Sequence, residues 1–169
     1  ITSNYTNSSQ SNAAIMLIST ADGTNGSQHI SGITLDGNNL VAYQGIIVYG
    51  RSNVKISYCA VKNFYNGGIL VRGTYRLGNN PTILAVGNEI SNCTIDNCSD
   101  RFSPNTGGGL VVTGFNGMLI HDNIQHQIGR PPGHNGNNFS IPASDTLCAG
   151  LKFYNNKEYR NPLDCTLAG

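Results

Sequence analysis

Charged side chains are scarce in this 169-residue sequence, which contains 10 Lys and Arg residues and 9 Asp and Glu residues. The resulting net charge is +1, and the isoelectric point is near 7.8. A protein that binds nucleic acid or an anionic membrane surface usually concentrates basic residues on one face. The composition therefore predicts no nucleic-acid partner.

Long hydrophobic runs and recognisable metal-binding motifs are also missing. The longest apolar candidate, AAIMLIST at residues 13–20, has the length of a strand, whereas a membrane-spanning helix needs about 20 apolar residues. The five cysteines do not have the spacing of a zinc site; they are Cys59, Cys93, Cys98, Cys148 and Cys165. We expect no membrane span and no metal ligands.

Glycine and asparagine are abundant, with 21 and 23 residues. Both residue types destabilise helices and favour turns and left-handed backbone conformations. The composition therefore argues against long helices and for a chain with many bends.

A short pattern recurs in the sequence, as YQGIIVYG at 43–50, NGGILVRG at 66–73 and TGGGLVVTG at 106–114. Each copy precedes a second apolar run, and its apolar residues alternate with a period of two, which predicts strands. Extending the pattern outwards gives five units of about 23 residues or more, a period typical of solenoids; the units are 13–39, 43–64, 66–98, 106–128 and 137–159. With no helix between them, such strands stack as turns of a coil, each pairing in parallel with its equivalent one turn away.

Three stretches, ISGITLDGNN, NVKISYCAVKNF and GLKFYNN, resemble the right-handed parallel β-helix, or pectin-lyase-like, superfamily, in particular its bacterial extracellular members. The resemblance covers residues 13–159 and implies an all-β, right-handed parallel β-helix of about five or more turns. It also implies a protein that is secreted or displayed at the cell surface. We expect residues 1–12 to be a flexible or fragmentary start, residues 160–169 to be a tail or the start of a further turn, and the chain to be a fragment of a longer helix.

Stacking the units predicts vertical columns of equivalent residues. One column is expected at a bend, where asparagine side chains form a hydrogen-bonded ladder; it contains Asn38, Cys59, Cys93, Asn123 and Asn156. Cys59 and Cys93 then serve as small buried groups. A disulfide between them is an alternative because their Cα atoms lie within range, although in-register side chains point the same way.

A second column points inward but changes character along the coil; it contains Leu40, Val61, Ile95, Gln125 and Glu158. A carboxylate in a core is costly unless it is paired. We therefore expect a slip of register after Asn123, with an opening of the coil at its C-terminal end as the alternative.

Insertions between the strands are the expected location of a functional site, because a solenoid carries function in its loops. Segments 99–106 and 129–137 leave the coil at the same corner in consecutive turns and should wall a groove. Segment 74–86 leaves after a Gly-rich strand, and Tyr49, Arg72 and Tyr75 should lie beyond the adjoining strand face. Arginine binds carboxylates through two bonds and amides suit sugar hydroxyls, so we expect Arg130 and His134 to be catalytic. The expected substrate-binding residues are Arg101, Arg72, Tyr49, Tyr75 and Asn135.

Outward columns supply further candidates. Asp96 and His126 should be neighbours and form an acid–base couple, with an ordinary solvated surface contact as the alternative. A similar interpretation applies to the column that contains Asp36, Ser57, Ser91 and His121. An apolar stripe made of Ile47, Leu70 and Val111 predicts either cover by a loop or self-association.

The resemblance implies a carbohydrate-active protein, because members of the superfamily include lyases, hydrolases, epimerases and non-catalytic fibres. A lyase or epimerase that acts on a uronate-containing polysaccharide is the first hypothesis. No cofactor is expected, except that a lyase of this kind can use Ca²⁺. The Asn-Thr-Asp, Asp-Asp, His-Gly and Arg-x-Lys set of polygalacturonases, the calcium cluster of pectate lyases and the Arg-x-His-Gly pattern of alginate lyases are all absent. A non-catalytic carbohydrate-binding, adhesin or fibre module is therefore the second hypothesis.

Overall fold

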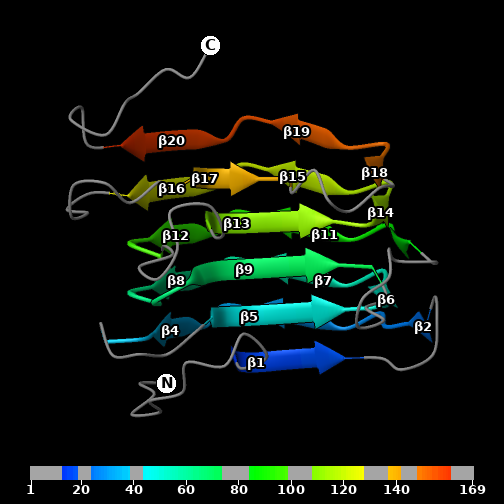
Figure 1. Cartoon of the computed structure of the whole chain (residues 1–169), viewed down its shortest axis with the longest axis horizontal. Coiled ribbons are helices and arrows are strands. Elements are labelled where there is room, and N and C mark those ends of the chain that lie inside the picture. Colours follow the sequence, from blue (N-terminus) through cyan, green and yellow to red (C-terminus); the bar gives the residue numbers. More distant parts are fainter. Residues whose placement is uncertain are drawn as a thin grey trace.

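The computed structural model describes residues 13–18, 24–38, 44–73, 84–98, 108–127, 137–141 and 148–160. These residues form five stacked turns of a parallel β-helix (Figure 1). Each turn contributes one strand to a five-stranded sheet that we call the front sheet. Its strands, in spatial order, are β1 (Ala13–Ile18), β5 (Gln44–Tyr49), β9 (Gly67–Arg72), β13 (Gly108–Thr113) and β17 (Asn137–Ser140).

Two further five-stranded sheets lie behind the front sheet. The first back sheet contains β3 (His29–Ser31), β7 (Lys55–Ser57), β11 (Glu89–Ser91), β15 (Leu119–His121) and β19 (Lys152–Tyr154). The second back sheet contains β4 (Thr34–Asp36), β8 (Ala60–Lys62), β12 (Thr94–Asp96), β16 (Ile124–Gln127) and β20 (Lys157–Arg160). Every pairing between turns is parallel and in register.

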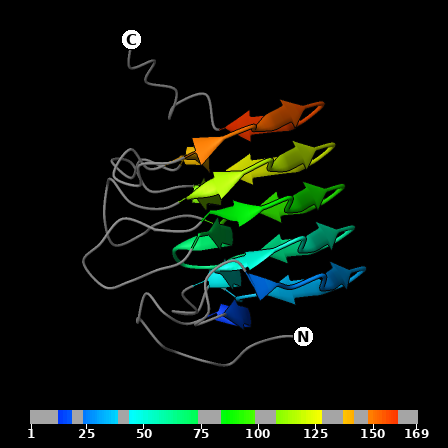
Figure 2. The same ribbon diagram turned by 90° about the vertical axis from the view of Figure 1, so that its right-hand side faces the viewer.

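Short strands connect the front sheet to the first back sheet. They form a two-stranded and a three-stranded sheet; the strands are β2 (Thr24–Asn25), β6 (Arg51–Ser52), β10 (Ala85–Val86), β14 (Phe115–Asn116) and β18 (Cys148–Ala149). In Figure 1 the front strands run from left to right, the back strands return, and the chain rises at each turn, so the coil is right-handed. Figure 2 shows the same turns from the side as stacked rungs.

The core is a set of apolar columns inside the coil. The alternation seen in the sequence places every second residue of a strand inward, so that each unit stacks its apolar residue on that of the next turn. Ile56, Ile90 and Ile120 form one such column and are at most 1% exposed. Burying each of these side chains contributes about 1.5–3 kcal/mol, and no turn can bury its apolar face without its neighbours.

The bend between the two back sheets depends on left-handed backbone. Tyr58, Asn92, Asp122 and Asn155 each have a φ of 53–56° there, and Gly32 occupies the equivalent place in the first turn. Asparagines that follow in the same bend form the expected ladder. The Nδ2–H of Asn123 donates to Oδ1 of Asn156 at 2.9 Å, and Oδ1 of Asn123 accepts the backbone N–H of Cys93 at 2.9 Å.

The register predicted for the first turn was wrong by five residues. Leu35, and not Leu40, pairs with Val61. Thr34 pairs with Ala60, so the residue equivalent to Cys59 in the bend column is Ile33, and not Asn38. Ser31, and not Asp36, pairs with Ser57. The other four turns have the predicted register.

The predicted slip after Asn123 was also wrong. Gln125 pairs with Ile95 on one side and Glu158 on the other, and its side chain is fully buried in the core. Glu158 is exposed at the last described turn, so the inward column becomes polar there without a change of register. The predicted segment 1–12 lies outside the described residues, as does the predicted segment 160–169 except for Arg160, which belongs to β20. The domain boundaries remain a prediction.

Candidate functional site

Most of the predicted groove lies outside the described residues. This applies to Arg101, Arg130, His134, Asn135 and Tyr75. The groove and the catalytic roles of Arg130 and His134 therefore remain predictions.

Two predicted binding residues on the front sheet are neighbours. Tyr49 of β5 pairs in register with Arg72 of β9, and both side chains are half-buried. The apolar stripe on the same face is largely covered, because Ile47 is fully buried and Leu70 and Val111 are half-buried. Self-association through this stripe remains a prediction.

Asp96 and His126 are adjacent as predicted, since they pair in register between β12 and β16. Within the described part of the chain, however, no hydrogen bond or ion pair joins them. The His126 ring instead contacts the ring of Tyr159, with centroids 4.8 Å apart and planes tilted by 59°. The two residues are therefore neighbours without the direct contact that an acid–base couple needs.

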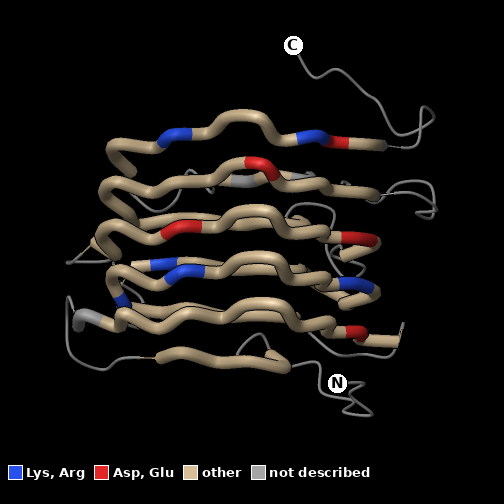
Figure 3. The backbone as a smooth tube through the Cα atoms, turned by 180° about the vertical axis from the view of Figure 1, so that it is seen from behind, with Lys and Arg blue, Asp and Glu red and all other residues tan. Residues whose placement is uncertain are grey.

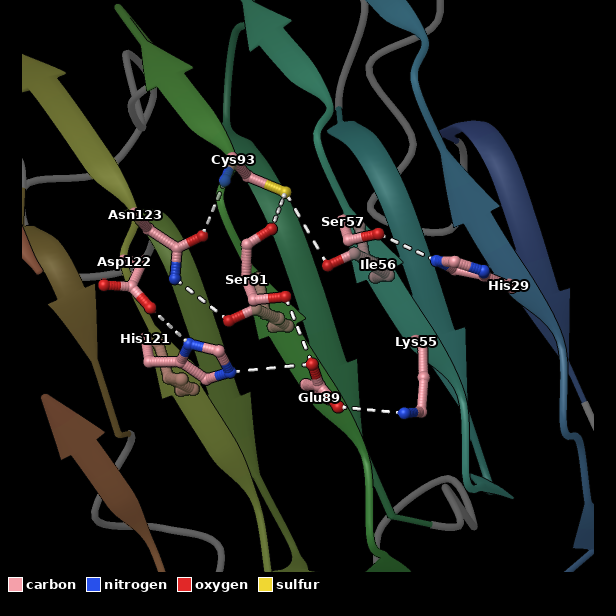
Figure 4. Close-up of polar contacts among 12 residues, drawn as sticks. His29, Lys55, Ile56, Ser57, Glu89, Ser91, Cys93, His121, Asp122 and Asn123 are labelled. Carbon is pink, nitrogen blue, oxygen red and sulfur yellow. Dashed lines mark hydrogen bonds and ion pairs between the residues drawn. The ribbon is translucent and has the colours of Figure 1, made fainter. Parts of the chain in front are cut away.

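A polar network on the first back sheet is the best-defined cluster of ionisable groups (Figure 4). His121, at the end of β15, donates its Nδ1–H to Oδ2 of Asp122 at 2.7 Å, and its Nε2 lies 3.5 Å from Oε1 of Glu89. Glu89 also pairs with Lys55 at 3.2 Å and accepts the Ser91 hydroxyl at 3.2 Å. The alternation of β11 and β15 places these side chains outward in neighbouring columns.

The network sets the ionisation of its carboxyl groups. Partial burial alone raises the pKa of Glu89, but the hydrogen bond and charge of Lys55, together with Ser91 and His121, lower it below its ordinary value. The hydrogen bond from His121 lowers the pKa of Asp122 in the same way. Both carboxylates are therefore charged over the whole neutral range.

A second, smaller cluster lies in the first two turns of the same sheet. The Nε2 of His29 and the Oγ of Ser57 are 2.7 Å apart, and the Ser31 hydroxyl lies 3.2 Å from the same Oγ. The serine column Ser31, Ser57 and Ser91 thus leads along the sheet to His121. The predicted column of Asp36, Ser57, Ser91 and His121 is therefore present, except that its first member is Ser31 and not Asp36.

The last described turn presents exposed aromatic and basic side chains together. Tyr154 and Tyr159 are 45% and 47% exposed, and Lys152 and Lys157 are exposed beside them on β19 and β20. The ring of Tyr154 stacks on His121 with centroids 4.9 Å apart and planes within 1°. Figure 3 shows basic residues on both back sheets of this turn, with an acidic residue next to one of them; this is Glu158, which follows Lys157 on β20. We call Tyr154, Tyr159, Lys152 and Lys157 the aromatic–basic patch.

The aromatic–basic patch was not predicted from the sequence. Its signal was nevertheless present, because the alignment of GMLIHDN with GLKFYNN places Tyr154 one turn above His121. The same alignment, continued along the chain, places Tyr159 above His126.

No site for a cation and no membrane span are found in the part of the chain that is described. Within these residues no three His, Cys, Asp or Glu side chains gather closely enough to hold a metal ion, and the use of Ca²⁺ remains a prediction. No helix among them could cross a membrane.

Comparison with known protein families, curated proteins and solved structures finds no match to this chain. The fold is therefore established by the stacked parallel sheets themselves, and the pectin-lyase-like resemblance rests on the sequence stretches alone.

Proposed function

We propose that this protein is a carbohydrate-binding parallel β-helix whose aromatic–basic patch binds an acidic polysaccharide. The observation that carries the proposal is the exposure of two tyrosines and two lysines on one turn of a rigid coil. Tyrosine rings provide large apolar contact areas with a polar tip, and apolar groups that are exposed side by side are typical of binding surfaces.

The geometry suits an extended polymer better than a small ligand. Lys152 and Tyr154 lie two residues apart on the same face of β19, a distance of about 6.4–6.8 Å along a strand. Tyr159 and Lys157 repeat this arrangement on β20, across the bend. A polymer that crosses the bend meets two apolar rings for its sugar faces and two ammonium groups for its carboxylates.

Binding without catalysis is favoured by the contacts of the ionisable groups. The carboxylate of Glu89 already pairs with Lys55, Ser91 and His121, and Asp96 does not contact His126. The lyase or epimerase hypothesis depends mainly on residues of the predicted groove, and the secreted or cell-surface location is likewise proposed from the resemblance.

The test is calorimetric titration of the protein with polygalacturonate, alginate and a neutral glucan. We expect binding to the two acidic polymers that weakens as salt is added. Tyr154→Ala combined with Tyr159→Ala should lower the affinity by at least about tenfold, which corresponds to about 1.4 kcal/mol.

A matched control is Tyr58→Asn, which removes a tyrosine that is 67% exposed in the second turn and keeps a residue that tolerates its left-handed backbone. If the double variant binds each of the three polymers with the same affinity as the unaltered protein, the patch is not the binding site. New ultraviolet absorbance from unsaturated uronate during the titration would establish the lyase hypothesis instead.

A further inference from the structure

Cys59 and Cys93 are stacked one turn apart in the bend between the two back sheets. They immediately precede the in-register pair Ala60 and Thr94, and the backbone N–H of Thr94 donates to the carbonyl oxygen of Cys59 at 2.8 Å. Neighbouring strands lie about 4.8 Å apart, which is inside the Cα separation of 4.4–6.8 Å found for disulfides. Both thiols are free and at most 2% exposed.

The two thiols differ in their readiness to ionise. Each sulfur lies near the carbonyl oxygen two residues earlier, at 3.2 Å for Cys59 and 3.3 Å for Cys93. A hydrogen bond from the Cys93 thiol lowers the pKa of Cys59 below its ordinary value, and that bond together with burial raises the pKa of Cys93. The shifts are opposite because only one of two adjacent thiols ionises readily, so Cys59 supplies the thiolate, which is the reactive form.

Cys98 provides a contrast within the same turn. It is fully buried and its sulfur lies 3.3 Å from the carbonyl oxygen of Asp96. Cys98 lies after the end of β12, whereas Cys59 lies directly before β8 and Cys93 lies directly before β12. Burial raises the pKa of Cys98 to about 12, and the equivalent residue one turn below it is Phe64, so Cys98 has no cysteine beside it there.

We propose that Cys59 and Cys93 form an oxidisable dithiol site, which reacts with a low-molecular-weight disulfide to form a disulfide that links turns two and three. The Cys59 thiolate attacks one sulfur of the small disulfide and expels one thiolate, which takes up a proton. The Cys93 sulfur, after losing its proton, then attacks the Cys59 sulfur and expels the second thiolate. The protein loses two electrons and two protons, and the small disulfide becomes two thiols.

The bend is a suitable place for the small movement that the bond requires. A disulfide brings its Cβ atoms to about 3.8 Å, closer than in-register side chains on neighbouring strands. The residues before the cysteines, Tyr58 and Asn92, are exposed and left-handed, so the backbone next to each cysteine lies at the surface of the coil. This inference does not depend on the proposed carbohydrate binding.

The test is incubation of the folded protein with oxidised glutathione in buffer without denaturant, followed by proteolysis and mass spectrometry. We expect a cross-linked pair of peptides containing Cys59 and Cys93, unchanged circular dichroism, and a midpoint of thermal unfolding that rises by several degrees and returns after reduction. Cys93→Ser should stop the reaction at a glutathione adduct on Cys59, and Cys98→Ser, the matched control, should still form the cross-link.

Three results would overturn the proposal. The first is glutathione on the exposed Cys148 with Cys59 and Cys93 still free, because the reagent is then active and the pair is not. The second is a cross-link that involves Cys98. The third is a Cys59–Cys93 bond that forms only after denaturant is added.

Discussion

Two buried amides in the fourth turn have opposite surroundings, although they are only two residues apart. The side chain of Asn123 bonds to Cys93, Ile90 and Asn156 at 2.9–3.0 Å. Among the described residues, neither polar atom of the Gln125 amide has a hydrogen-bond partner. A buried polar group without a partner bears a desolvation penalty of about 1–3 kcal/mol.

Substitution of the two amides should therefore change stability in opposite directions. Gln125→Leu restores the apolar character that Leu35, Val61 and Ile95 give this column, and should raise the free energy of unfolding by about 1–2 kcal/mol. Asn123→Ala leaves backbone groups of Cys93 and Ile90 unpaired, and should lower it by about 1–3 kcal/mol. Urea unfolding measures both, and a loss of stability in Gln125→Leu would contradict the assignment of this residue to the core.

The Glu89 carboxylate makes stability depend on pH. Its folded pKa lies below its ordinary value of 4.5, so the folded state binds fewer protons than the unfolded state between these values. The stabilisation is complete above the ordinary pKa and is lost as the pH falls through 4.5 towards the lower folded pKa. Glu89→Gln should flatten this part of the profile of unfolding free energy against pH.

Lys55→Met is the companion variant, because it removes the main group that lowers the pKa of Glu89. We expect it to weaken the acid dependence only in part, since Ser91 and His121 still contact Glu89. If the unaltered protein, Glu89→Gln and Lys55→Met all show the same dependence of unfolding free energy on acidic pH, the contacts of Glu89 with Lys55 and His121 contribute nothing to stability.

At the scale of strands, the recurring Gly-rich run is explained by close approach between turns. A Cβ atom on Gly68 of β9 would lie 2.6 Å from the carbonyl oxygen of Gly109 and 2.6 Å from Cγ2 of Ile95. Gly45 occupies the equivalent place in β5 and meets Val61 and the backbone of Gly68. The glycine therefore recurs because neighbouring turns approach closely where β5 and β9 begin.

Gly68→Val should destabilise the protein by about 1–3 kcal/mol or prevent folding, because the side chain has no space beside a fixed backbone oxygen. The control is Gly32→Asn, at a bend where no atom lies within 4 Å of the added Cβ and asparagine tolerates the left-handed φ of 68°. Thermal unfolding followed by circular dichroism distinguishes the two. A Gly68→Val protein as stable as the control would contradict the observed stacking of β9 on β13.

Strands and their pairing were predictable for turns two to five, and not for turn one. In the later turns a left-handed residue is followed by a small or amide residue, Cys59, Cys93, Asn123 or Asn156, which marks the bend in the sequence. In turn one Gly32 and Ile33 form this bend. The asparagines at 38 and 39 imitate the expected signal five residues later, which explains the error.

At the scale of the whole molecule, the fold was predictable because the solenoid repeats its apolar alternation, and each copy supports the assignment of the next. The predicted groove has no such support, since segments 99–106 and 129–137 interrupt the period. Contacts between side chains were equally hard to predict. Register placed Asp96 beside His126 correctly, but it did not show that His126 contacts Tyr159 instead.

Charge is distributed unevenly along the coil. In the first three turns basic and acidic residues offset one another, as in the pairs Lys62–Asp36 and Lys55–Glu89, both at 3.2 Å. Exposed surface pairs of this kind contribute little to stability, but they leave these turns nearly neutral. The exposed lysines of the fifth turn have no such ion pair among the described residues, which is why an anionic polymer is expected to bind there.

The most direct test of this account is tyrosine footprinting by hydroxyl radicals, read by mass spectrometry, with and without an acidic polysaccharide such as polygalacturonate. Tyr154 and Tyr159 should become protected when the polymer is present, whereas Tyr58, which is more exposed and lies three turns away, should be modified at the same rate. Protection of Tyr58 with continued modification of Tyr154 and Tyr159 would place the polymer elsewhere and contradict the proposed binding site.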